Sequence, residues 1–384
     1  MDRHRRSPTL AAWVAMLFVA FTTAAAADGP PAVNFDAIAK SPVDRLSPEQ
    51  VKGLTARVDF WLQQLSQTKD PQEVQAAREG LLADYKAVDK SFYQSRVAAL
   101  AGERALAVLT ALPAEWKSLK EVNIALALSQ MPQVAIREAL EKLIVADNPG
   151  VRYCGWVGYR NIRTLVLAFP AGSTFEKQMY QSLRDQAEKE PSGPVVTVII
   201  QMLQMTPVVP TGVSRQAFEQ FQQTAYDILQ SVWTKRCREV MAGDAGMAEA
   251  CRKAVSVVER FSLVFPGDAA RKKQMLQMVL DMAWCSAKAY GNLTEAAKEE
   301  AAKVREANGS LLRECESSLA SLSGTRANYI SQRLAESGPT VGLAVLDWAK
   351  ALKDQGVVSP EDRFAAPASA PASAPAAPAT KPGT

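Results

Sequence analysis

Histidine is nearly absent from the sequence, and this scarcity narrows the chemistry open to the chain. The only histidine among 384 residues is His4, which lies in an N-terminal segment that we expect to be removed. Ser-His-Asp and Cys-His catalysis are thereby excluded within the remaining chain, as are His-bearing zinc sites and the two-His iron triad. No Cys-x-x-Cys pattern is present, which argues against a redox motif or a zinc knuckle. We expect no metal site and no cofactor, while carboxylate-pair and Ser/Lys chemistry stay open.

Long hydrophobic runs are also missing, apart from one short run near the N-terminus. Three arginines within residues 3–6 precede the apolar residues 10–21, and alanines ending at Ala27 follow. A positive head, a short apolar core and an Ala-x-Ala exit are typical of a secretory signal peptide. We therefore expect a signal peptide over residues 1–27, no later membrane span, and a periplasmic or secreted protein, with a bacterial host favoured.

Excess charge of either sign is lacking as well. Without residues 1–27, the 44 basic and 40 acidic residues of the chain become 41 and 39. A nucleic-acid binder needs a basic stripe that neutralises phosphates. A nearly neutral chain argues against a dedicated role of that kind, so we expect no nucleic-acid partner.

Strand patterns are scarce, whereas helical patterns are common. Residues 247–265 place apolar side chains at alternating steps of three and four, which is one helical face, and residues 194–205 start with Pro194, favoured in a first helical turn. We expect an all-α fold of antiparallel helix pairs. Residues 28–46, with three prolines, read as an extended lead-in, and the Ala/Pro/Ser-rich residues 359–384 as a disordered tail.

A weak internal repeat suggests how the helices are arranged. Residues 140–152 and 183–195 match at a shift of 43 or 44 residues, and each contains an acidic, Pro- and Gly-containing loop between two helices. Two helices in about 40–47 residues is the period of HEAT and armadillo repeats.

Residues 147–152, Asp-Asn-Pro-Gly-Val-Arg, resemble the Asp-x-Pro-x-Val-Arg turn of a HEAT repeat. The resemblance is best over residues 115–205. It implies that Asp147 caps the second helix, that Pro149 belongs to the turn, that Val151 enters the core and that Arg152 ties neighbouring repeats together. We expect HEAT-like repeats, stacked as an α-solenoid, over residues 47–210 and a helical region over 211–358, either solenoid or bundle.

One stripe of the helix expected from residue 151 to 169 is a candidate binding surface. Arg152, Trp156, Tyr159 and Arg163 alternate large aromatics with arginines on one side of it. Such a stripe suits a peptide, a glycan or an acidic partner through stacking and charge-assisted hydrogen bonds. The alternative is that the aromatics pack against the next repeat, as aromatic stripes in repeat proteins commonly do.

The five cysteines offer one candidate disulfide. Cys237 and Cys251 lie symmetrically about a turn at residues 243–244, so an antiparallel hairpin would place them at one height. Export would permit a bridge, and Cys285 is the competing partner for Cys251. The alternative is that all five are small buried apolar residues.

These observations favour an exported, non-enzymatic helical-repeat scaffold that binds a protein partner. A small-molecule or glycan-binding module is the alternative, using the same arginine and aromatic stripe. A histidine-free enzyme such as a lytic transglycosylase is more remote. It rests on the dipeptide Glu336-Ser337, where a carboxylic acid could protonate a leaving oxygen, and Pro339 breaks the helix there.

Overall fold

The computed structural model describes residues 29–170, 172–204, 207–291, 298–336 and 340–364. These residues are all-helical and contain no strand, as the sequence predicted. No helix among them is long and apolar enough to cross a membrane. The expected signal peptide lies outside the described residues.

The chain divides into two compact units, Met1–Ala127 and Leu128–Thr384. The division falls well before residue 210, where we expected the repeats to end. Besides the one-turn segments Val134–Ile136 and Lys353–Gln355, the helices are α2 (Phe35–Lys40), α3 (Pro48–Gln67), α4 (Pro71–Lys86), α5 (Ser91–Thr110), α6 (Lys117–Ser129), α7 (Arg137–Leu143), α8 (Pro149–Leu167), α9 (Thr174–Lys189), α10 (Gly193–Leu203), α11 (Arg215–Met241), α12 (Ala245–Val264), α13 (Ala269–Gly291), α14 (Lys298–Ser323), α15 (Tyr329–Ala335), α16 (Val341–Ala351) and α17 (Pro360–Phe364).

Two segments differ from the sequence-based expectation. The lead-in over residues 28–46 contains α2, which begins where the side chain of Asn34 accepts a hydrogen bond from the amide of Ala37. The expected disordered tail over 359–384 begins with α17, in which Arg363 is held by Asp281 of α13 at 2.8 Å. Residues 365–384 lie outside the described residues.

Helix ends follow local capping chemistry. Three helices begin with proline directly after a side-chain cap: Ser47 before α3, Asp70 before α4 and Asn148 before α8. Proline suits the first helical position because its missing N–H has no intrahelical partner there. After α11 and α12 the chain turns at Gly243 and Gly267, whose φ angles of 89° and 80° favour glycine.

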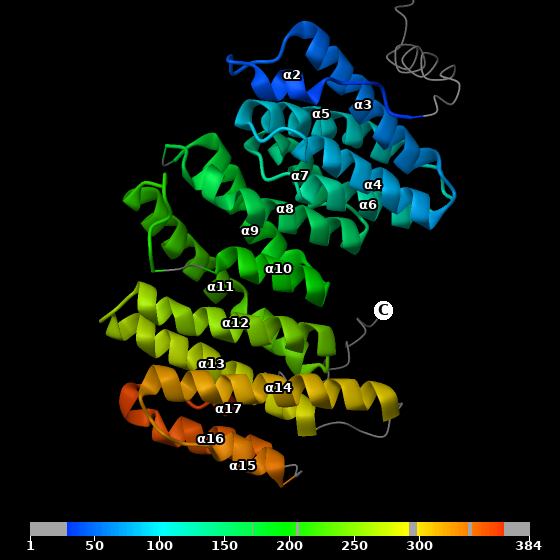
Figure 1. Ribbon diagram of the computed structural model, residues 1–384. Coiled ribbons are helices and arrows are strands. Elements are labelled where there is room, and N and C mark those ends of the chain that lie inside the picture. Colours follow the sequence, from blue (N-terminus) through cyan, green and yellow to red (C-terminus); the bar gives the residue numbers. More distant parts are fainter. Residues whose placement is uncertain (1–28, 171, 205–206, 292–297, 337–339, 365–384) are drawn as a thin grey trace, which may run out of the picture. The chain divides into compact units, whose positions relative to one another are not determined.

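The second unit stacks alternate helices beside one another. In one row α8 packs on α10, α10 on α12 and α12 on α14, and in the other α9 packs on α11 and α11 on α13. Consecutive helices such as α11 and α12, or α13 and α14, join the two rows (Figure 1). The apolar run in residues 194–205 is indeed helical, as α10, with Val195, Val198 and Ile199 at most 2% exposed. The row α8–α10–α12 carries the candidate site.

Candidate functional site

The aromatic residues of the expected binding stripe are not on the surface. The side chains of Trp156 and Tyr159 are 0% and 1% exposed. Their ring centroids lie 5.8 Å apart, and the Tyr159 hydroxyl donates to Glu141 of α7. This corrects the prediction of a four-residue stripe, because two buried rings offer no surface to a partner. The alternative considered from sequence, packing against the next repeat, also requires buried rings, but the hydrogen-bond partner of Tyr159 lies on the preceding helix α7.

The largely buried guanidinium of Arg152 is hydrogen-bonded to other groups of the protein. Its guanidinium donates to both carboxylate oxygens of Glu190 at 2.7 and 2.8 Å, and to the carbonyl oxygens of Ala146 and Asp147 at 2.8 Å. Glu190 is fully buried at its side chain. Hydrogen bonding to Glu190 raises the pKa of Arg152. Arg152 therefore joins the loop before α8 to the loop before α10.

The turn at residues 147–152 differs in one detail from the role that the resemblance implied. The helix cap is Asn148, whose side chain accepts from the amide of Gly150 at 2.9 Å, rather than Asp147. Pro149 is the first residue of α8, and Val151 is 2% exposed. Val151 thus enters the core as expected.

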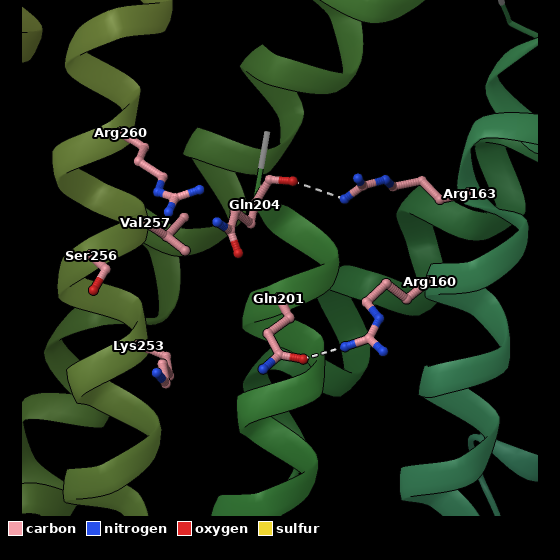
Figure 2. A pocket seen from close by; sticks show the side chains of 8 residues that line it. All are labelled: Arg160, Arg163, Gln201, Gln204, Lys253, Ser256, Val257 and Arg260. Atoms are coloured by element: carbon pink, nitrogen blue, oxygen red, sulfur yellow. Dashed lines mark hydrogen bonds between the residues drawn. The ribbon is translucent and has the colours of Figure 1, made fainter. Parts of the chain in front are cut away.

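Arg163, the last member of the stripe, lines a surface cleft. The cleft has a volume of about 460 Å³ and spans three adjacent helices of one row. Figure 2 shows its lining side chains: Arg160 and Arg163 from α8, Gln201 from α10 with Gln204 just beyond its end, and Lys253, Ser256, Val257 and Arg260 from α12. Four of these eight residues are cations and none is an acid.

The two arginines on the α8 side are held in place by α10. Arg160 donates to the side-chain oxygen of Gln201. Arg163 donates to the backbone carbonyl oxygens of Met202 and Gln204 at 2.6 and 2.9 Å, at the C-terminal end of α10, where orphan carbonyls need donors. Burial, together with the neighbouring charge of Arg160, lowers the pKa of Arg163. A bound anion would relieve this repulsion.

The two cations on the α12 side are exposed. Neither Lys253 nor Arg260 has an ion pair within the described part of the chain. The acids of α12 are occupied elsewhere, since Glu249 pairs with Arg252 at 3.1 Å and Glu259 accepts from Ser318 of α14 at 2.8 Å. The positive charges of Lys253 and Arg260 are therefore not neutralised by ion pairs with acids of α12.

One carboxylate approaches the cleft from its edge. The hydroxyl of Ser256, which lines the cleft, donates to Glu314 of α14 at 2.5 Å. Glu314 itself is not part of the lining. The cleft surface thus keeps four positive side chains interspersed with amide groups, which is the chemistry of an anion-binding surface.

The chain was compared with family models, curated proteins and solved structures, and none of them matches it. No role is therefore carried over to this chain from a known protein. Its function is inferred from the geometry of its own residues.

The remaining candidates from sequence show no catalytic or metal-binding arrangement in the described residues. Glu336 lies at the end of α15 and pairs with Arg333 at 2.9 Å on the surface, while Ser337 lies outside the described residues. No group of three or more His, Cys, Asp or Glu side chains there is placed to hold a metal ion.

The disulfide predicted between Cys237 and Cys251 is not formed in the structure. All five cysteines are free and buried. The thiol of Cys237 is hydrogen-bonded to the thiol of Cys285 on α13. Burial raises the pKa of Cys237 and the pKa of Cys251. The geometry thus matches the alternative of small buried apolar residues.

Sequence reasoning missed most of the cleft. It singled out Arg163 but not Arg160, Lys253 or Arg260. Two spacings in the sequence could have indicated these residues. Arg160 and Arg163 are three residues apart on one helix, and Lys253 and Arg260 are seven residues apart on another. Each spacing places its pair on one helical face.

Proposed function

We propose that this chain is a non-enzymatic binding protein, a helical-repeat scaffold that holds an acidic segment of a partner protein in the α8–α10–α12 cleft. The observation that carries the proposal is a cleft with four cations and no acid among its lining residues. Arginine and lysine bind carboxylates through charge-assisted hydrogen bonds, and complementary charge directs partners to a surface.

The arrangement of the second unit supports a scaffold role. Alternate helices pack beside one another in rows, and stacked helix pairs present long continuous binding surfaces in repeat proteins. The Arg152–Glu190 bridge between successive loops agrees with the tie between neighbouring repeats that the HEAT resemblance implies. We further propose, from residues 1–27, that the protein acts outside the cytoplasm, which an intact mass starting at Asp28 would support.

A binding assay with an acidic polypeptide tests the proposal. Poly-glutamate labelled with a fluorophore is titrated with the protein and followed by anisotropy. The variant is Lys253→Gln with Arg260→Gln, two exposed side chains without a described ion pair, so the fold should persist. The matched control is Lys177→Gln with Arg184→Gln, which removes the same charge from exposed positions on α9 that do not line the cleft.

We expect the cleft variant to bind poly-glutamate at least tenfold more weakly than wild type at low salt, while the control stays close to wild type. Binding should also weaken steeply with added salt, because exposed charges are screened. Equal losses in the two variants would reduce the effect to net charge and would contradict the proposal.

A further inference from the structure

The cleft carries its positive charges in two rows that cross the three helices. In Figure 2 one row contains Arg163, Gln204 and Arg260, and the other contains Arg160, Gln201 and Lys253. Each row thus joins an arginine of α8, a glutamine of the α10 segment and a cation of α12.

The spacing of the rows follows from helix geometry. Arg160 and Arg163 are three residues apart, which is a rise of about 4.5 Å at 1.5 Å per residue. Lys253 and Arg260 are seven residues apart, which is a rise of about 10.5 Å along α12. By the same measure Gln201 and Gln204 are about 4.5 Å apart on the α10 segment. Along the helix axes, the point halfway between Arg163 and Arg260 is therefore about 7.5 Å from the point halfway between Arg160 and Lys253. A single carboxylate or a single oxyanion is too small to engage both rows across most of the cleft.

An extended peptide has a repeat that matches this separation. Successive side chains of a β-strand point to opposite faces, and residues i and i+2 lie on one face about 6.6–6.8 Å apart. Two acidic residues separated by one residue would thus place one carboxylate in each row. Two adjacent acidic residues would point one carboxylate away from the cleft.

We infer that the cleft binds an extended acidic segment with the pattern acid-x-acid, where each acid is Asp or Glu. The inference rests on the proposed function, because it names the partner segment that the same cleft would hold. One acid is bound between Arg163 and Arg260, and the other between Arg160 and Lys253. Gln201 and Gln204, in the middle of the rows, supply amide donors to the carboxylates or to the peptide backbone.

A pair of peptides with equal composition tests the spacing. One fluorescent peptide is Ser-Thr-Ser-Glu-Thr-Glu-Ser-Thr-Ser and the other is Ser-Thr-Ser-Glu-Glu-Thr-Ser-Thr-Ser. We expect the spaced peptide to bind about tenfold more tightly at low salt, since a second charge-assisted contact contributes roughly that factor. Either Lys253→Gln or Arg260→Gln should lower the affinity of the spaced peptide to that of the adjacent one, whereas Lys177→Gln should leave the ratio unchanged.

Competition measurements separate the alternatives. Equal affinity of the two peptides, with poly-glutamate still bound through Lys253 and Arg260, would overturn the spacing rule but leave the proposed function standing. Competition by inorganic phosphate as effective as that by the spaced peptide would also overturn it. Both proposals are contradicted if the Lys253 and Arg260 substitutions leave the affinity for every acidic polypeptide unchanged. They are also contradicted if a single-stranded oligonucleotide binds through these cations more tightly than any peptide.

Discussion

The bridge between Arg152 and Glu190 should be one of the strongest single contacts in the second unit. Its perturbation is Arg152→Met, which keeps an unbranched side chain but removes the guanidinium. This change leaves the Glu190 carboxylate fully buried with one remaining donor, the amide of Ser192 at 2.9 Å. It also removes the donors to the carbonyl oxygens of Ala146 and Asp147.

The magnitude follows from the geometry of the bridge. Two charge-assisted hydrogen bonds at 2.7 and 2.8 Å join the groups, and a buried carboxylate without its partner has an uncompensated charge. Removing one member of a buried pair costs about 3–5 kcal/mol of folding free energy. Glu190→Gln should cost less, because its amide oxygen still accepts from Arg152. In a double-mutant cycle the two changes should couple by about 2 kcal/mol or more.

Hydrogen exchange followed by mass spectrometry is the suitable assay, because a chain with two units need not unfold in a single step. Peptides that cover α8 and α10 report local opening, and peptides from α3 and α4 serve as an internal reference. Lys303→Met is the matched control, since the Lys303–Glu299 pair is exposed and such pairs contribute less than about 1 kcal/mol. A coupling below about 0.5 kcal/mol between residues 152 and 190 would refute a strong bridge.

Three further outcomes follow from the structure. Burial raises the pKa of Asp281 to about 6, so the folded state binds the proton more tightly than the unfolded state, and this stabilisation is lost as pH rises from 4 through 6. Relative to Asp281→Asn, the free energy of unfolding of wild type in urea should fall by about 2 kcal/mol between pH 4 and pH 7. Gly193→Ala should lower the thermal midpoint by several degrees, because its Cβ would meet the backbone of Gly246, whereas Gly309→Ala should be neutral or stabilising. Wild-type affinity for poly-glutamate should fall at least tenfold between 50 and 200 mM salt, measured by anisotropy, and a flat salt profile would contradict charge recognition.

Much of the fold could be predicted because its signals are local. Turn glycines such as Gly243 act within a few residues of the helix ends that they define, and periodicity shows which face is apolar. The cap of α8 was expected one residue too early, at Asp147 instead of Asn148. The preference of Pro194 for a first turn was enough to read the β-branched run after it as a helix. The short helix α2 was missed because six residues give too little periodicity.

The site could be predicted only in part, because it depends on tertiary packing. A period of 3.6 residues reveals one apolar stripe, but α8 packs against both α7 and α10 and buries a wider arc, which includes Trp156 and Tyr159. The cleft needs Arg163 and Arg260, almost a hundred residues apart in the chain, to line one surface. Their proximity is set by the packing of α8, α10 and α12, which no local pattern contains.

The buried cysteines give the protein a built-in reporter of its own unfolding. Their thiols are enclosed, and burial raises the pKa of Cys154 to about 11, so the folded chain should react slowly with alkylating reagents, which attack thiolates. An unfolded chain would present five ordinary thiols. Because Cys237, Cys251, Cys285 and Cys315 come from four successive helices, opening of one region would expose several at once, and in an oxidising medium the open chain could be trapped by mispaired bridges before it refolds.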